Sequence, residues 1–125
     1  MKKNYRNLTE REKEILDFLL KEDFPGRDEL VIQVANSKVR TIQEYNDNWG
    51  SLEFLIKTDI RANVNERVPV QASTLDRDNI PITVLLHVVS GNIDELEIIK
   101  ADNSPIIKPF TAADLRIDKV KHENQ

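Results

Sequence analysis

The sequence predicts an α+β fold, with two N-terminal helices packed on one face of an antiparallel β-sheet of about five strands. Apolar residues recur at helical spacing before residue 36, and from there onward apolar and polar residues alternate between clusters of turn formers. A chain of 125 residues fits a single domain. We expect a helical part over 8–35, a sheet over 38–107 and a frayed tail over 118–125.

A first helix is predicted to begin after Thr9, which is a good N-cap residue. Glu12 stands three residues later, at the capping-box spacing that satisfies two unpaired backbone N–H groups. An apolar stripe then runs to about Lys21 and consists of Ile15, Leu16, Leu19 and Leu20. One face of this helix should therefore be buried.

A second helix and a first hairpin come next. Pro25 and Gly26 interrupt the helical pattern, and a short helix is expected over Arg27–Ala35. Residues 39–45 favour a strand, 46–50 are rich in turn formers, and 51–58 alternate with Leu52, Phe54 and Ile56 facing inward.

The segment 80–100 is predicted to form the central hairpin. A third strand over 68–72 and a turn at 76–79 lead into it. A three-residue loop from Ser90 to Asn92 buries apolar side chains on one face, whereas a two-residue loop at 91–92 would mix them with acidic ones. The three-residue loop aligns Val84 with Ile98 and Leu86 with Leu96, and it places His87 opposite Glu95 with Glu97 on the same face.

Two further elements are expected near the C-terminus. Ile106 and Ile107 are predicted to add a brief edge pairing, and Thr111 with Asp114 marks a helix start.

Composition limits the function. There is no cysteine, which rules out disulfides and thiolate chemistry, and 39% hydrophobic with 32% charged residues is typical of a soluble globular protein. No apolar run is long enough for a signal peptide or a membrane span, so we expect a cytoplasmic location. The three glycines form no phosphate-binding loop and no metal-ligand spacing occurs, so we expect no cofactor and no metal.

The negative charge is concentrated in the second part of the chain. The net charge is -4, and residues 41–125 carry nine basic against fourteen acidic side chains, a balance of -5. Such a field disfavours nucleic acid and favours a basic protein partner, although a merely solvated acidic face has the same composition.

The candidate partner-binding residues are six side chains of the central hairpin and its turns, and one tryptophan. The tryptophan is a potential interface anchor, or it packs over the end of the first hairpin. The histidine is either functional or a structural partner of the glutamate opposite it. The candidates are Trp49, Asp76, Asp78, His87, Asp94, Glu95 and Glu97.

No catalytic residue is predicted. Glu95 and Glu97 are two positions apart on a strand, and exposed carboxylates at that spacing lack the burial that would separate their pKa values into an acid and a base. We therefore expect a protein that is not an enzyme.

The words LTEREKEIL, from Leu8 to Leu16, resemble the opening helix of the helix-turn-helix domain of bacterial response regulators. That interpretation requires residues 39–45 to be a recognition helix, where Lys38 and Arg40 would be the nearby cations. It is the weakest of the alternatives.

The chain also resembles a family of small, uncharacterised bacterial domains. The resemblance rests on D-F-P-G-R-D-E-L from Asp23, W-G-S-L at Trp49, V-P-V-Q-A at Val68 and V-L-L-H-V-V-x-G-x-x-x-E-L-E-I from Val84, and it spans about 8–107. Such small, acidic domains are similar in character to immunity proteins that neutralise secreted toxins.

The leading hypothesis is a protein-binding domain, immunity-like or antitoxin-like, that occludes a basic toxin domain with its acidic sheet face. The alternative is a small-molecule-binding domain with a pocket between helices and sheet. The helix-turn-helix regulator is the third.

Overall fold

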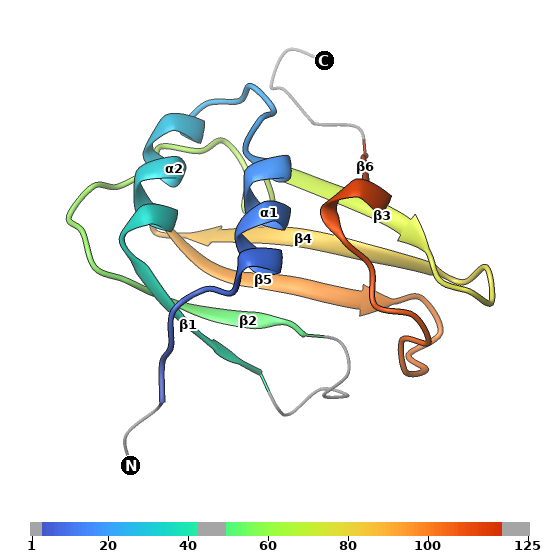
Figure 1. Cartoon of the computed structure of the whole chain (residues 1–125). Coiled ribbons are helices and arrows are strands. Elements are labelled where there is room, and N and C mark those ends of the chain that lie inside the picture. The colour runs from blue at the N-terminus through green and yellow to red at the C-terminus, as the bar shows by residue number, and fades with distance from the viewer. Residues whose placement is uncertain (1–3, 43–49, 119–125) are drawn as a thin grey trace.

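The computed structural model describes residues 4–42 and 50–118 (Figure 1). Two helices open the chain, and the strands come after them. The elements in order are α1 (Glu10–Leu19), α2 (Arg27–Ala35), β1 (Ser37–Thr41), β2 (Leu52–Ile56), β3 (Val70–Leu75), β4 (Pro81–Val89), β5 (Asn92–Lys100), the 3-10 helix η1 (Ala112–Asp114) and β6 (Arg116–Ile117).

The strands form one antiparallel sheet in the order β1-β2-β5-β4-β3-β6. The β4–β5 hairpin lies in the middle, as predicted, and the first hairpin is β1–β2. The sheet has six strands rather than about five. The additional strand is β6, a two-residue pairing with β3 that no sequence pattern indicated.

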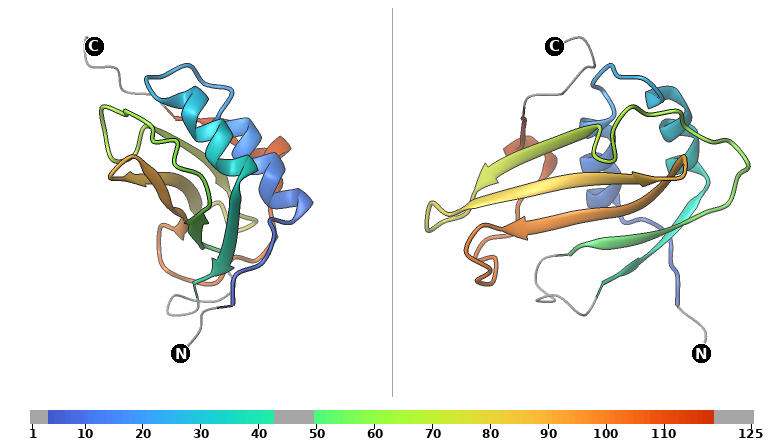
Figure 2. Two further views of the ribbon diagram at one scale, coloured as in Figure 1. Left: turned by 90° about the vertical axis from the view of Figure 1, so that its left-hand side faces the viewer. Right: turned by 180° about the vertical axis from the view of Figure 1, so that it is seen from behind.

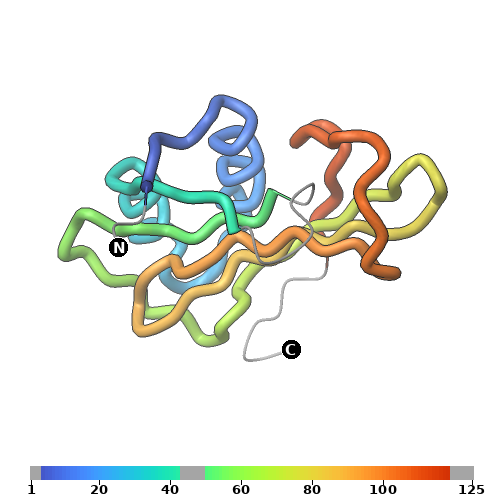
Figure 3. The backbone as a smooth tube through the Cα atoms, turned by 90° about the horizontal axis from the view of Figure 1, so that it is seen from below, coloured from blue at the N-terminus to red at the C-terminus, as the bar shows by residue number. Residues whose placement is uncertain are grey.

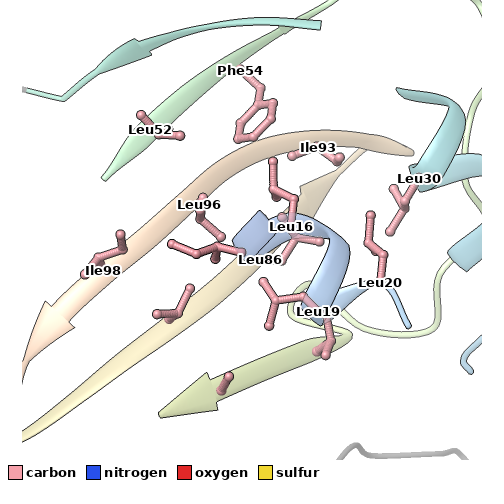
Figure 4. Packing of buried hydrophobic residues seen from close by; sticks show 14 of the residues in the cluster. Leu16, Leu19, Leu20, Leu30, Leu52, Phe54, Leu86, Ile93, Leu96 and Ile98 are labelled. Carbon is pink, nitrogen blue, oxygen red and sulfur yellow. The ribbon is translucent and has the colours of Figure 1, made fainter. Parts of the chain in front are cut away.

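Both helices cover the same face of the sheet, which makes the molecule a two-layer α+β fold (Figure 2). The space between the layers is filled by buried apolar side chains from α1, α2, β2, β4 and β5, and Figure 4 shows the central ones. Leu16, Leu30, Leu86 and Leu96 are each fully buried there. The centre of the interface between helices and sheet is therefore filled by packed side chains.

The helix boundaries are set by local chemistry. Thr9 caps α1, and the capping box with Glu12 is present in both directions. Arg6 also donates to both carboxylate oxygens of Glu12, at 2.9 Å each. Helix α2 spans Arg27–Ala35 as predicted, and it begins after Gly26, whose φ of 90° suits glycine.

The register of the central hairpin is confirmed, but its loop is not the one expected. Val84 pairs with Ile98, Leu86 with Leu96 and His87 with Glu95. The loop has two residues, because Val89 pairs with Asn92; Ser90 and Gly91 have φ of 54° and 80°, as in a type I′ turn. A β-bulge at Asp94 leaves this residue without a partner on β4, so that the pairing from His87 and Glu95 onward is the one predicted.

A buried glutamine ties α2 to this turn. The side chain of Gln33 is fully buried, and its amide donates to the carbonyls of Ile60 and Gly91 at 2.9 and 2.8 Å. Its carbonyl accepts from the backbone N–H of Ile93 at 2.9 Å. Two of these bonds anchor the helix to the β4–β5 turn, and the bond to Ile60 anchors it to the segment between β2 and β3.

Both edges of the sheet are partly covered. Arg6 forms an isolated bridge with Val39 on β1, and β6 pairs with β3 on the other side. The prediction of edge pairing at Ile106 and Ile107 is wrong, because these residues lie in an irregular segment. The predicted helix start at Thr111 is confirmed as the one-turn helix η1 with its capping box.

The segment after α2 contradicts the helix-turn-helix alternative. Ser37–Thr41 is strand β1, paired along its length with β2, where a recognition helix would have to begin. Residues 43–45 lie outside the described part of the chain.

The first residue of the predicted tail has defined contacts. Asp118, placed in the expected tail, accepts hydrogen bonds from Gln71 and Ser73 on β3. Among residues 4–42 and 50–118, no helix has the length and apolar character needed to cross a membrane.

Candidate functional site

The face of the sheet opposite the helices is open in part and carries polar side chains at its centre. In β4 and β5 the inward side chains are buried, whereas the outward ones between the strand ends are half-buried. Neither helix lies on this face (Figure 2, left). The outward set is Thr83, Leu85 and His87 on β4 and Glu95, Glu97 and Ile99 on β5.

Four side chains cross this outer face in one row. Arg40 on β1 pairs in register with Glu53 on β2, Glu53 with Glu95 on β5, and Glu95 with His87 on β4. We call these four residues the charged row. Paired residues on adjacent strands have neighbouring side chains, so the row is continuous across four strands.

Both ends of the charged row are paired. Arg40 lies 2.6 Å from a carboxylate oxygen of Glu53, whose other oxygen accepts from the hydroxyl of Tyr5 at 2.6 Å. At the other end, His87 Nε2 lies 2.8 Å from Glu97 Oε1. The guanidinium Nε of Arg67 donates to His87 Nδ1 at 3.1 Å.

Glu95, inside the row, is not paired in this way. Its Oε2 is buried and has no hydrogen-bond partner. Burial raises the pKa of the Glu95 carboxyl, and the negative charge of Glu97 raises it further, while His87 acts in the opposite direction. The free protein thus keeps a carboxylate whose charge is incompletely compensated.

The outer face is acidic at its centre and basic at its periphery. Asp94, Glu95 and Glu97 come from β5, and we call them the acidic centre. The cations come from the edges: Lys38 and Arg40 from β1, Arg67 from the segment before β3, and Arg116 from β6. Exposed apolar side chains border the same face at Leu55, Leu75 and Val89.

Two of the predicted site residues, Asp76 and Asp78, lie apart from the charged row and pair with Lys100. The carboxylate of Asp76 is fully buried and accepts from Lys100 Nζ at 2.9 Å and from the backbone N–H groups of Arg77, Ile107 and Lys108. Lys100 also donates to Asp78 at 2.7 Å. We call Asp76, Asp78 and Lys100 the distal charge cluster.

The distal charge cluster joins the β3–β4 turn to the segment 101–110, which lie together at one end of the molecule (Figure 3). Burial alone would raise the pKa of Asp76, but the backbone N–H groups and Lys100 hold it well below its usual range. Asp76 therefore has no surface for a partner. Asp78 keeps about a third of its side chain exposed, yet it too is bonded to Lys100.

The other predicted site residues are brought together on the outer face, with one exception. His87, Glu95 and Glu97 are neighbours there, as the register predicted. Asp94 is exposed at the bulge beside Glu95. Trp49 lies outside the described residues.

Tyr5, Arg40, Glu53 and Arg67 belong to the site but were not predicted from the sequence. The β1–β2 register would have indicated the Arg40–Glu53 pair, because residues opposite each other share a face. No local pattern marks Tyr5 or Arg67, whose contacts span 48 and 20 residues of sequence.

A polar cleft of about 430 Å³ lies beside the charged row, between the segment 62–67 and the turn at 88–91. Arg67 lines this cleft and also donates to His87 of the row. Two further open clefts lie on the helical side, of about 450 Å³ between α1 and η1 and about 510 Å³ between α1 and α2. Within the described ranges, no three His, Cys, Asp or Glu side chains are grouped so that they could hold a metal ion.

The fold and the site define a class of protein: an α+β domain whose two helices close one face of an antiparallel sheet and leave a polar, partly exposed face on the other side. Residues 5–109 match the family described as Domain of unknown function (DUF6984), and the chain belongs to that family. The match contains the segment 8–107 on which the resemblance to a small uncharacterised family rested. None of the curated proteins and none of the solved structures compared with the chain gives a match.

Proposed function

We propose that this domain is a cytoplasmic protein-binding module, immunity-like or antitoxin-like, whose outer sheet face receives a basic segment of a partner. The proposal is carried by one observation: Glu95, in the charged row of the outer face, has a carboxylate oxygen without a hydrogen-bond donor. Because this oxygen is itself buried, a lysine or arginine of a partner would compensate the charge through the exposed part of the Glu95 side chain rather than by direct contact with Oε2.

The arrangement of charges supports a cationic protrusion rather than a flat basic surface. The acidic centre is flanked by the protein's own cations at the sheet edges, which would repel a uniformly basic partner. A single basic loop, for example one from a toxin domain, would reach the carboxylates without meeting those cations. The bordering leucine and valine side chains would add apolar contact.

The partly covered edges of the sheet favour a partner that binds the outer face over one that adds a strand to the sheet. A partner that extended the sheet would need free backbone groups on β1 or β3, and Arg6 and β6 already pair with these strands. The expected contact is therefore made by side chains.

Calorimetry with purified proteins encoded by neighbouring genes tests this function. The expected result is a complex with one of them that Glu95→Lys weakens by about tenfold or more, since like charges in an interface are repulsive. Glu14→Lys is the matched control, because Glu14 is exposed on α1, away from the outer face, and the substitution changes the net charge equally. Equal weakening by both variants, or no complex with any neighbour, would count against the proposal.

A second candidate function is the binding of a small polar molecule in the cleft between 62–67 and 88–91, which is lined by Asn63, Asn65, Glu66, Arg67 and Ser90. Screening polar metabolites by ¹H–¹⁵N NMR tests it. Saturable shifts confined to these two segments would support it, and their absence would leave the protein-binding function as the better explanation.

A further inference from the structure

His87 has a different partner on each ring nitrogen. Nδ1 lies 3.1 Å from Arg67 Nε, and Nε2 lies 2.8 Å from Glu97 Oε1. An arginine N–H can only donate, and an ionised carboxylate can only accept. The contacts are therefore satisfied by a neutral imidazole that carries its proton on Nε2 and accepts at Nδ1.

We propose that His87 is a proton-operated latch for the side chain of Arg67. The neutral ring holds the guanidinium beside the acidic centre, and protonation of Nδ1 releases it. A protonated Nδ1 presents an N–H toward the N–H of Arg67, so the hydrogen bond is lost, and the two cations repel each other.

The charges around the ring determine which contact breaks. The β5 carboxylates lie on one side of the ring, with Glu97 at Nε2, and the Arg67 guanidinium lies on the other side, at Nδ1. On β3 the side chain of Gln71 lies opposite Leu85, two residues before His87 on the same face, and it is neutral and donates to Asp118. Protonation therefore keeps the Glu97 contact and loses the Arg67 contact. The charged groups around His87 are Glu95 opposite it and Glu97 in contact with it on β5, Asp94 beside Glu95, Glu53 opposite Glu95 on β2, and Arg67 at Nδ1. Glu66 precedes Arg67 and lines the neighbouring cleft.

Only the side chain of Arg67 is free to move. Its carbonyl accepts from the backbone N–H of Val88 at 2.7 Å, which fixes the main chain against β4. The side chain itself is exposed and makes its contact from outside the sheet. Release of the latch thus changes the wall of the neighbouring cleft and leaves the fold intact.

The latch would regulate the partner site, an extension that rests on the proposed function. Protonation adds one positive charge to the charged row and frees a second one beside it. A cationic partner bound at neutral pH is then expected to lose affinity by about tenfold or more in mild acid.

NMR of the free chain tests the latch without any partner, so its failure and the failure of the proposed function are distinguishable. At about pH 8 the ¹⁵N shifts of His87 should report the Nε2–H form. As the ring is protonated, the Nε–H signal of Arg67 should move to the position typical of a solvated arginine, in step with the His87 signals.

His87→Gln is the control variant, since a glutamine amide can accept from Arg67 and donate to Glu97 but does not titrate. In this variant the Arg67 signal should not change between about pH 8 and pH 5. The latch is refuted by an Nδ1–H ring at high pH, by an Arg67 signal that does not change in step with His87, or by an unchanged response in His87→Gln.

Discussion

The distal charge cluster and the charged row are built from the same kinds of side chain but differ in how completely they are paired. In the cluster, Lys100 donates to two carboxylates and to the carbonyl of Pro105, and both oxygens of Asp76 are hydrogen-bonded. In the row, Glu95 Oε2 and Arg40 Nε are buried without a partner.

This difference can be compared with the energetic cost of an unpaired charge. A charge inside a protein must be fully hydrogen-bonded, because an unpaired one costs on the order of several kcal/mol, which is comparable with the stability margin of a whole fold. A partly paired network at a surface can gain its missing contacts from a ligand. The complete pairing of the cluster is typical of a structural network, and the incomplete pairing of the row is the feature on which the proposed binding function rests.

Asp76→Ala should have the largest effect on stability, because it leaves the buried Lys100 and three backbone N–H groups without their main acceptor. We expect a loss of about 3–5 kcal/mol in the free energy of unfolding, measured by urea denaturation. Asp59→Ala, at an exposed aspartate, is the matched control and should change stability by less than about 0.5 kcal/mol. Similar values for the two variants would remove the distinction between cluster and surface.

Lowering the pH should reduce the contribution of the distal charge cluster to the stability of the fold. The pKa of Asp76 is lowered in the folded state, so its contribution to stability is present above the unfolded value of about 4 and is lost as the pH falls through the folded value. Urea unfolding below about pH 4 should show this loss in the wild-type chain and much less of it in Asp76→Ala. A parallel acid dependence in both would contradict the assignment.

Gln33→Met measures how much the buried, uncharged side chain of Gln33 contributes to stability. The backbone N–H of Ile93 would lose its acceptor, and a loss of about 1–3 kcal/mol is expected. Thermal unfolding measures it, and Gln71→Met, which alters a half-buried glutamine on β3, is the comparison. An effect no larger than that of Gln71→Met would show that the bonds from α2 to the β4–β5 turn contribute little.

Glu95→Gln should have the smallest effect, and with the opposite sign. The pKa of Glu95 is raised in the folded state, so the ionised carboxylate disfavours folding as the pH rises through the folded value. Removing the charge should stabilise the protein at neutral pH, by less than about 1 kcal/mol because the side chain is partly exposed to screening water. Destabilisation at pH 7 would mean that Glu95 has a stabilising partner in solution.

Local rules predicted much of the fold. The capping box of Thr9 and Glu12 and the bounds of α2 depend on neighbouring residues, and the inward alternation of Val84, Leu86, Leu96 and Ile98 set the hairpin register. Strand β6 depends on contacts with β3 across more than 40 residues of sequence, so no local signal could indicate it. The same holds for the irregular path of the segment 106–108, where Asp76 accepts from the backbone N–H groups of Ile107 and Lys108.

The site was predicted less well, for a related reason. Aspartates in a turn are usually solvated, so the sequence placed Asp76 and Asp78 on an acidic surface; Lys100, at the far end of the next hairpin strand, brings them together instead. The pairing of His87 with Glu95 was predictable from the register. The closer contacts of His87, with Glu97 and Arg67, depend on side-chain directions that the register does not specify.

The bulge at Asp94 interrupts the alternation of inward-facing and outward-facing side chains along β5. Ile93 and Leu96 both face the core, although they are three residues apart. If Asp94 is left out, the sequence Ile93-Glu95-Leu96-Glu97-Ile98 alternates regularly, so deletion of Asp94 should preserve every inward and outward assignment. Asp94 is thus a point where the chain can gain or lose one residue without exchanging the two faces of its sheet, and cross-strand NOEs between His87 and Glu95 in the deletion variant would test this.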